Sequence, residues 1–402
     1  MKRTITKRTR PSFVGLFSGC GGFDLGFVQA GFHCVAAFDY DAEAVATHRK
    51  NLGGNVYCLD VTQNSDQVVT AVSQADVLVA GPPCQGFSTI GKRALNDPRN
   101  SLLLFVADVA SVAKPKVVVV ENVAGVLSPP HDRYWRQLES RLRRAGYTCK
   151  TIRFAASDFG VPQTRVRVML IGTLSGAELH IPLHGGAAPT LRDILHGAES
   201  FSNHHPSVLQ PGSAALEIAK RIGQGQKLCN VRGGERSVHT WHIPEVFGHV
   251  SDVEREVLQT LMRLRRQLRV RTFGDADPVS AEALSEALNR PCKRHLNSLV
   301  RKNFVRRVGD LYDLTNSFNG KYRRLSWTDL APTVDTRFGQ PRFFLHPEHH
   351  RGFSVREAAR IQGFPDDFEF EGSVESQFRM VGNAVPPPLA ASVARSIRDS
   401  EF

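Results

Sequence analysis

The chain has 402 residues, of which 41% are hydrophobic and 22% charged, an ordinary composition for a folded protein with room for a catalytic domain and one smaller module. Its formal net charge of +12 favours a polyanionic partner such as nucleic acid. No apolar run approaches the ~20 residues of a membrane span, and no apolar core follows the basic residues 1–10, so neither a membrane anchor nor a secretory signal is expected.

The seven cysteines are odd in number and irregularly spaced, which argues against a disulfide framework and for a reducing compartment. Cys229, His239 and His242 are conceivable metal ligands, but their spacing fits no zinc pattern, so no metal is predicted. We therefore expect a cytoplasmic protein, associated with the nucleoid if the host is prokaryotic.

Apolar strands alternate with helical stretches in the first part of the chain, the pattern of a parallel sheet covered on both faces. Strands are expected at residues 13–17, 34–39, 56–61, 77–80, 117–120 and 166–171. Helices are expected at residues 22–31, 42–50, 101–113 and 133–145. This order predicts an α/β fold with a doubly wound, mostly parallel sheet and an antiparallel final hairpin. The C-terminal helix after Pro388 should pack near the first strand.

The character of the sequence changes where Gly and Pro cluster at residues 182–189. From there the chain is basic and lacks the strand–helix alternation, which returns after Arg323. We therefore predict one catalytic domain, residues 1–181 plus 321–402, that is split by a smaller inserted domain, residues 182–320.

Part of the insert, residues 252–315, has a pattern of its own. Apolar residues recur at helical spacing in residues 253–268, 280–289 and 293–303, and the Gly309-Asp310 turn that follows predicts a hairpin. Three helices and a hairpin are typical of a winged helix-turn-helix that binds DNA with its third helix and its wing. The basic residues placed there are Lys293, Arg294, Arg301, Lys302, Arg306 and Arg307. The alternative is a helical spacer whose basic residues are only solvated.

A glycine-rich turn at residues 17–23 joins the first predicted strand to the first helix, where a backbone can bend sharply and approach a ligand. Asp39, at the end of the second strand, would bind ribose hydroxyls. Tyr40 would stack on an adenine, and Asp60 would accept a hydrogen bond from its amino group. Asp24 stands where a dinucleotide fingerprint has its third glycine, which disfavours NAD. The turn indicates a nucleoside cofactor; the alternative is a tight turn whose acids cap helices.

Cys84 follows the fourth predicted strand, at the sheet edge where ligands bind in open parallel sheets. A thiolate that attacks carbon 6 of cytosine makes carbon 5 nucleophilic enough to take a methyl group from a sulfonium donor. Glu121, after the valine strand, shares that edge and would hydrogen-bond the ring during the attack. Arg165 and Arg167 should share one face, one holding the base carbonyl and the other a phosphate or Glu121. The alternatives are a buried thiol, a helix-capping acid and surface arginines.

Together these segments resemble the cytosine-5 DNA methyltransferase family, whose motifs they match in order. The matching segments are residues 17–23, 83–85, 97–104, 121–123, 163–167, 324–335 and 382–386. The resemblance implies a methyltransferase-type fold in which the inserted domain recognises the DNA target, with S-adenosylmethionine as the cofactor. It also implies that Cys84 is the nucleophile and that Glu121 contacts the target base, supported by Arg167 and Arg165.

The resemblance assigns further residues to the cofactor and the DNA. Those around the cofactor would be Phe17, Gly19, Cys20, Gly22, Asp39, Tyr40, Asp60, Val61, Gly81, Pro83, Leu102, Asn383 and Ala384. Residues 86–98 look like the family's mobile loop, which closes over a base flipped out of the duplex. The DNA contacts expected in this part of the chain are Gln85, Ser88, Lys92 and Arg93.

The resulting hypothesis is a monomeric enzyme that methylates carbon 5 of cytosine in a specific sequence of double-stranded DNA. It is compatible with a restriction-modification system whose endonuclease is encoded separately. One alternative is the family's transfer-RNA-methylating branch, against which the sizeable basic insert argues. The other is a catalytically silent DNA-binding regulator, against which the presence of Cys84, Glu121 and Arg167 argues.

Overall fold

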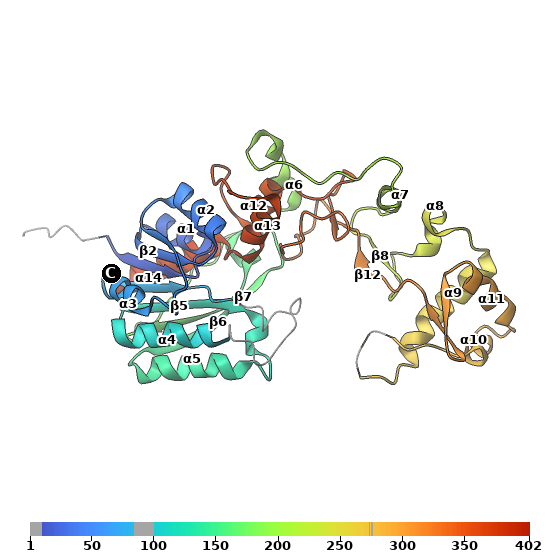
Figure 1. Cartoon of the computed structure of the whole chain (residues 1–402), viewed down its shortest axis with the longest axis horizontal. Helices are drawn as coiled ribbons and strands as arrows, with labels where there is room; N and C mark the ends of the chain where they lie inside the picture. The colour runs from blue at the N-terminus through green and yellow to red at the C-terminus, as the bar shows by residue number, and fades with distance from the viewer. Residues whose placement is uncertain (1–9, 84–99, 273, 275) are drawn as a thin grey trace, which may run out of the picture. The chain divides into compact units, whose positions relative to one another are not determined.

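The computed structural model describes residues 10–83, 100–272, 274 and 276–402 (Figure 1). The chain divides into two compact units, which are described separately. The first contains Met1–His204, Leu330–Thr336 and Val355–Phe402, and the second contains His205–Asp329 and Arg337–Ser354.

This division differs from the predicted insert, residues 182–320, at both ends. Residues 182–204 belong to the first unit, where the Arg360 guanidinium donates to the carbonyl oxygens of Ile194 and His196. Residues 321–329 belong to the second unit, where buried Arg324 donates to the carbonyl oxygen of Ile222. Hydrogen bonds from arginine side chains to backbone carbonyl oxygens therefore help to hold residues 182–204 in the first unit and residues 321–329 in the second.

The first unit is built on a seven-stranded sheet of order β3-β2-β1-β4-β5-β7-β6. Its strands are β1 (Ser12–Leu16), β2 (His33–Asp39), β3 (Val56–Cys58), β4 (Val77–Ala80), β5 (Val117–Val123), β6 (Thr148–Ala155) and β7 (Val166–Thr173). The first five are parallel, whereas β7 runs antiparallel to both β5 and β6. The mostly parallel sheet with an antiparallel final hairpin is confirmed.

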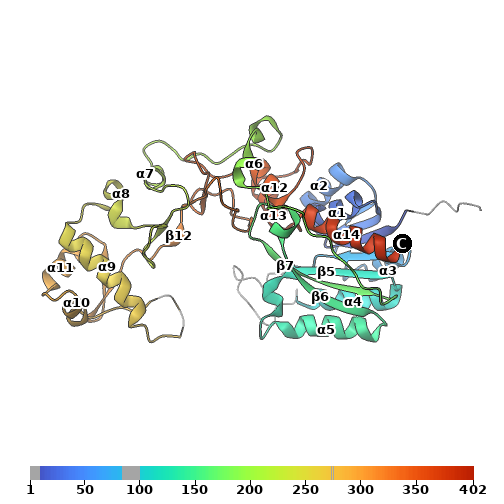
Figure 2. The same ribbon diagram turned by 180° about the vertical axis from the view of Figure 1, so that it is seen from behind.

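Helices cover both faces of this sheet (Figures 1 and 2). One face is covered by α3 (Ser65–Ser73), α4 (Ser101–Ala113) and α5 (Asp132–Arg144), and the other by α1 (Gly22–Gln29) and α14 (Pro387–Glu401). The further helices of this unit are α2 (Ala42–Leu52), α6 (Leu191–Leu195), α12 (Val355–Gln362) and α13 (Val374–Asn383). Short 3-10 turns are η2 (Ala124–Leu127), η3 (Ala156–Phe159) and η4 (Ala198–Ser200). Strand β6 and helix α3 were not predicted.

The valine strand β5 shows why the sheet is buried on both sides. Val118 and Val120 pack into the core beneath α3, α4 and α5, whereas Val117 and Val119 pack into the core beneath α1 and α14. Successive side chains of a strand point to opposite faces, so an unbroken apolar run is required here. Helix α14 shares its core with Phe13 of β1, as predicted.

Among the described residues of the second unit, two small hydrophobic clusters stand out. One lies around the three-stranded sheet of order β12-β8-β9, and the other lies within three helices and a two-stranded hairpin. The strands are β8 (Lys227–Cys229), β9 (Ser237–Val238), β10 (Val305–Val308), β11 (Leu311–Leu314), β12 (Asn319–Lys321), β13 (Arg323–Arg324) and β14 (Phe344–Leu345). The helices are α7 (Ala214–Lys220), η5 (Thr240–His242), α8 (Pro244–Phe247), α9 (Asp252–Gln267), α10 (Ala281–Ala287) and α11 (Lys293–Arg301). The predicted order of three helices and a hairpin is present in α9–α11 and β10–β11.

None of the helices formed by the described residues combines the length and apolar character that crossing a membrane requires.

Close packing of α1 on α14 gives a first prediction. An added Cβ at Gly26 would lie 2.4 Å from the Ala390 Cβ and 2.6 Å from the Ala391 backbone nitrogen, which cannot move aside easily. Gly26→Ala should therefore lower the free energy of unfolding by about 1–3 kcal/mol although alanine favours helices. Gly185→Ala, where an added Cβ meets nothing within 4 Å, is the control for denaturant unfolding. Equal stability of the two variants would contradict the packing argument.

Candidate active site

The glycine turn between β1 and α1 is held against the end of β2. Gly19 and Gly21 have positive φ angles of 53° and 95°, which favour glycine. The Gly19 amide donates to the Asp39 carboxylate at 2.8 Å, and the Ser18 amide donates to the Phe38 carbonyl oxygen at 3.1 Å. The turn therefore presents a fixed backbone at the carboxyl edge of the sheet, where ligands of open α/β sheets bind.

The predicted cofactor acids have different surroundings. Burial raises the pKa of Asp39, whose other oxygen accepts a hydrogen bond from the Asp41 amide. Tyr40 beside it exposes 73% of its surface, so its ring is open to solvent. Asp60 accepts from the hydroxyl and the amide of Thr62, and these bonds lower its pKa. Asp60 thus organises a local turn through Thr62.

The other predicted cofactor residues gather around the same edge. Gly22 packs so closely that an added Cβ would lie 2.8 Å from the Val385 carbonyl oxygen, next to predicted Ala384. Cys20 is buried, its sulfur faces the Met380 carbonyl oxygen at 3.8 Å, and burial raises its pKa to about 12. Any contact of Cys20 with a cofactor would therefore use its backbone. Of the remaining predicted cofactor residues, Val61 is buried. The others are partly exposed or exposed: Phe17, Gly81, Pro83, Leu102 and Asn383.

The predicted base-contacting acid is buried beside an arginine. Glu121 lies inside β5, which continues past the predicted end at residue 120 because it pairs with β7 as far as Val123. The Arg167 Nε lies 2.7 Å from the Glu121 Oε1, and the two side chains are 12% and 10% exposed. Burial raises the pKa of Glu121, although Arg167 and then Arg165 oppose the shift. A carboxyl that retains its proton to higher pH suits hydrogen-bond donation to a ring nitrogen.

Arg165 has a different environment from the one predicted. It lies before β7 begins, is fully buried, and donates to the carbonyl oxygens of Val334, Gly382 and Ala384 at 2.9–3.0 Å. Strand alternation does not extend to it, so it does not share the position of Arg167. Its guanidinium instead fixes the backbone that carries the predicted cofactor residues Asn383 and Ala384.

Gln163 is a structural partner that the sequence did not single out by itself. Its side-chain amide donates to the Ile361 carbonyl oxygen at 3.0 Å, and its oxygen accepts from the Val334 amide at 3.2 Å. In the sequence, only the position of Gln163 within residues 163–167, a segment that matches a family motif, pointed to a role for it. Gln163 and Arg165 together attach the C-terminal segments to the start of β7.

The predicted nucleophile Cys84 lies outside the described residues, as do Gln85, Ser88, Lys92 and Arg93. The described chain reaches Pro83, and the side-chain amide of Asn122 donates to the Pro82 carbonyl oxygen at 3.3 Å. Since Asn122 follows Glu121, this bond ties the segment leading to Cys84 to the strand that carries the acid.

The predicted DNA contacts of the second unit divide into two groups. Lys302 pairs with Glu254 and Arg306 pairs with Asp313, both at 2.7 Å, so internal carboxylates already neutralise these two charges. Exposed Arg307 donates to the neutral side chain of Asn297. Three further predicted DNA contacts are exposed, and they form no ion pair with a carboxylate of the described chain. They are Lys293, Arg294 and Arg301.

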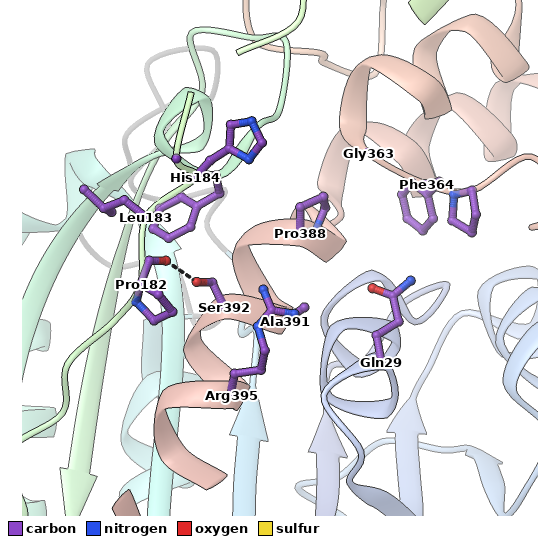
Figure 3. Close-up of a pocket in the computed structure, with 13 residues that line it drawn as sticks. Gln29, Pro182, Leu183, His184, Gly363, Phe364, Pro388, Ala391, Ser392 and Arg395 are labelled. Atoms are coloured by element: carbon purple, nitrogen blue, oxygen red, sulfur yellow. Dashed lines mark hydrogen bonds between the residues drawn. The ribbon is translucent and has the colours of Figure 1, made fainter. Parts of the chain in front are cut away.

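A cavity of about 560 Å³ lies in the first unit between α1, α14 and residues 182–185 (Figure 3). Gln29, His184, Phe364, Ser392 and Arg395 line it, whereas no predicted site residue does. The cavity is therefore separate from the edge that carries Asp39 and Glu121, and the candidate site is defined by the sheet edge.

The fold and this edge define an α/β protein with a candidate ligand site at the carboxyl ends of its parallel strands, and comparison with known proteins identifies it further. Residues 12–399 match the family model of C-5 cytosine-specific DNA methylase. The chain belongs to this family.

Relatives and solved structures agree with that membership. The chain is 32% identical to the Type II methyltransferase M.XorII of Xanthomonas oryzae pv. oryzae, over 97% of this chain and 85% of the relative. It is 29% identical to M.AgeI of Thalassovita gelatinovora, over 96% and 98%. A candidate DNA modification methyltransferase from an E. coli prophage has the same fold, with a TM-score of 0.60 and 22% identity over 97% of this chain and 99% of that one.

Family membership decides between the interpretations left open by the sequence. The chain is a DNA methyltransferase that acts on carbon 5 of cytosine. The family model favours this activity over a transfer-RNA methyltransferase and over a catalytically silent regulator.

The raised pKa of Glu121 predicts a pH-dependent stability difference. A carboxyl whose pKa is raised by folding destabilises the fold only when ionised, so this cost is absent below its ordinary pKa and grows as pH rises toward the raised value. The stability of Glu121→Gln relative to wild type should therefore increase as pH rises above the ordinary glutamate pKa of about 4. Denaturant unfolding at fixed pH steps measures it, with Glu178→Gln at a 91% exposed carboxylate as the control. A flat or falling difference for Glu121→Gln would contradict the assignment.

Proposed function

We propose that this methyltransferase uses S-adenosylmethionine to methylate cytosine in a specific sequence of double-stranded DNA, with Cys84 as a covalent nucleophile. The buried Glu121–Arg167 pair carries the proposal, because it places a proton-retaining carboxyl on the strand tied to the segment that leads to Cys84. An exposed acid at this position would be ionised at neutral pH and unable to donate a proton.

The residues at the glycine turn fit a sulfonium nucleoside donor. The Asp39 carboxylate at the end of β2 would accept from ribose hydroxyls, the exposed ring of Tyr40 would stack on the adenine, and the backbone near Gly19 is open, since a Cβ there meets nothing within 4 Å. When bound, the donor supplies an electrophilic methyl group. Asn383 and Ala384 would complete the site on the backbone that Arg165 holds.

The protein's residues would activate the base. The Cys84 thiolate adds to carbon 6 of a cytosine flipped out of the duplex, while Glu121 donates a hydrogen bond to the ring nitrogen and stabilises the negative charge that would otherwise build there. Carbon 5 would then take the methyl group from the sulfonium, whose sulfur would leave as a neutral thioether. Transfer of the carbon 5 proton to water would re-form the double bond as the bond between carbon 6 and the Cys84 sulfur breaks and the thiolate leaves. Arg167 keeps Glu121 oriented throughout.

The second unit would recognise the DNA. We assign phosphate contacts to the exposed cations without an internal carboxylate partner, Arg294 and Arg301 among them, on the three-helix and hairpin segment that resembles a winged helix. The similarity to Type II methyltransferases supports a role in restriction-modification with a separately encoded endonuclease. A monomer acting in the cytoplasm completes the proposal.

Trapping on 5-fluorocytosine tests the covalent mechanism. Fluorine at carbon 5 cannot leave as a proton does, so the adduct should persist once the methyl group has been transferred. Incubation with S-adenosylmethionine and duplex DNA that carries 5-fluorocytosine at every cytosine should give a denaturation-resistant complex.

The control variant is Cys84→Ala, which should give no complex, and RNA of the same sequence should trap far less protein than duplex DNA. An adduct of undiminished yield with Cys84→Ala would exclude Cys84 as the nucleophile.

Two double variants with equal charge change test the DNA contacts. Arg294→Gln with Arg301→Gln should flatten the salt dependence of DNA binding by about 2 in log–log slope, about 0.9 for each phosphate that the protein no longer neutralises. Lys302→Gln with Arg306→Gln should leave the slope nearly unchanged but lower the melting temperature, because buried Glu254 loses the Lys302 ammonium, whereas Asp313 keeps its contact with buried Arg265. Equal changes of slope in both double variants would contradict the assignment.

A further inference from the structure

A buried acid–histidine pair lies between α1 and α2 and takes no part in the proposed chemistry. The His48 Nε2 lies 2.8 Å from the Asp24 Oδ2, and the side chains are 0% and 1% exposed. The His48 Nδ1 is buried and has no partner among the residues that the structure describes. A neutral ring that donates from Nε2 fits this environment, because a protonated ring would bury a second N–H without an acceptor.

This pair packs directly against the glycine turn. A Cβ added at Gly15 would lie 2.6 Å from the Asp24 Oδ2, and one added at Gly21 would lie 2.8 Å from the His48 Cδ2. Gly15, in the strand just before the turn, lies against Asp24 and the Ser18 hydroxyl on its inner side, and Gly21 within the turn lies against His48. The turn rests on Asp24 and His48 from within, while Asp39 holds it from the end of β2.

The carboxylates of Asp24 and Asp39 both act electrostatically on the glycine turn. Asp24 lies in the first turn of α1, where the helix dipole favours a negative charge. Burial raises the pKa of Cys20, the turn's own thiol, and Asp39 and Asp24 both add to that shift. A buried negative charge thus lies immediately beneath the backbone that faces the ligand edge.

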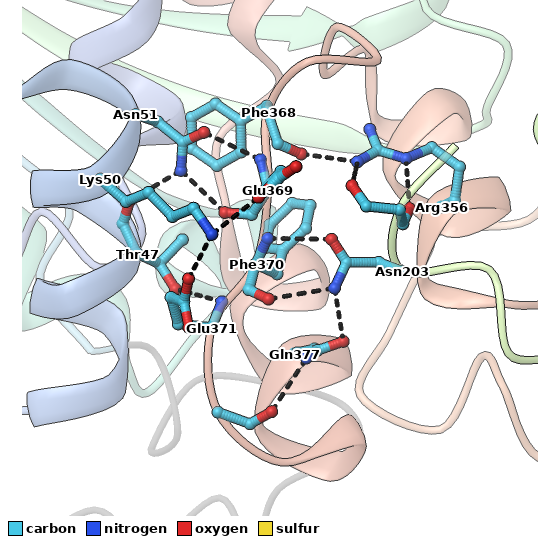
Figure 4. A network of polar contacts seen from close by, with 12 residues as sticks. Thr47, Lys50, Asn51, Asn203, Arg356, Phe368, Glu369, Phe370, Glu371 and Gln377 are labelled. Carbon is cyan, nitrogen blue, oxygen red and sulfur yellow. Dashed lines mark hydrogen bonds and ion pairs between the residues drawn. The ribbon is translucent and has the colours of Figure 1, made fainter. Parts of the chain in front are cut away.

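Helix α2, which supplies His48, is anchored on its other side by a polar network (Figure 4). The Thr47 hydroxyl accepts from the Glu371 amide at 2.9 Å, and the Asn51 side chain exchanges two hydrogen bonds with the backbone of Glu369 at 2.8 Å each. Lys50 pairs with both Glu369 and Glu371. Residues adjacent to His48 are therefore fixed, so the imidazole is presented to Asp24 from a helix that cannot easily shift.

We propose that Asp24 and His48 are positioning residues that hold the glycine turn in the conformation that receives the methyl donor. The proposal rests on the proposed donor site at this turn. The hydrogen bond sets the distance between α1 and α2, and the turn that begins α1 follows that distance. Loss of the bond should weaken donor binding while the DNA-binding unit is unaffected.

A pair of amide variants separates the hydrogen bond from other properties of His48. His48→Gln can still donate to Asp24, whereas His48→Asn is one methylene shorter and cannot reach it. Calorimetric titration with S-adenosylmethionine should show affinity weakened at least about tenfold for His48→Asn and within about threefold of wild type for His48→Gln, since small misplacements of a binding backbone are costly. The affinity for duplex DNA should stay within about twofold in both.

A control variant for a general loss of stability is available at the end of β1 that lies away from the glycine turn. There Asp76 accepts from the amide and hydroxyl of Ser12 and pairs with Lys116 at 2.8 Å. Asp76→Asn should lower the melting temperature and leave donor affinity unchanged. If His48→Asn does not fold, the double variant Asp24→Ala with His48→Leu replaces it, because it leaves no lone buried charge, and it should also lose donor affinity.

Gly19→Asn distinguishes the two proposals. Asparagine tolerates the positive φ of Gly19 and adds a side chain to the open space over the turn. If Gly19→Asn loses donor affinity and His48→Asn does not, the positioning role is overturned and the donor site stands. If Gly19→Asn binds the donor as wild type does, the donor site itself is wrong. Loss of affinity in Gly19→Asn and His48→Asn, with His48→Gln close to wild type, supports both.

Discussion

The ion pair of Glu121 and Arg167 is the interaction on which the active-site edge depends. A buried carboxyl without a partner would be costly, and a fully solvated one would be ionised at neutral pH. The antiparallel strand β7 resolves this conflict, because it brings Arg167 opposite Val123, one step diagonally from Glu121 on the same face of the sheet. The Arg167 guanidinium therefore offsets part of the cost of burying the Glu121 carboxyl, and the pKa of Glu121 remains raised.

The same strand joins the two sequence blocks of the catalytic unit. Gln163 and Arg165 lie just before β7, and their side chains bind backbone groups that are 169–219 residues further along the chain. These bonds hold together two blocks of the catalytic unit that the inserted segment separates in the sequence. Arg167 contacts Glu121 and Arg165 holds the C-terminal backbone, so the segment around β7 links the strand that carries Glu121 to the segment that carries Asn383 and Ala384.

The parallel strands and the C-terminal helix were predictable from sequence because long apolar runs and glycine turns are local signals. Strand β6 was missed because it lacks the continuous apolar run of the buried strands, and α3 because β-branched valines weaken its helical signal. The sequence also did not predict the backbone partners of Arg165 or the role of His48, since the partners of both are distant in the chain or on another helix. The internal pairing of Lys302 and Arg306 likewise depends on tertiary contacts that composition does not reveal.

We propose that the buried carboxyl of Glu121 serves methylation of carbon 5 of cytosine. Base-resolved sequencing of 5-methylcytosine can test this role in DNA from cells that make equal amounts of wild type or Glu121→Gln. Complete modification is expected at one defined sequence with wild type, and a loss of at least about a hundredfold with the variant. Equal modification by both proteins, or no 5-methylcytosine with wild type, would contradict it.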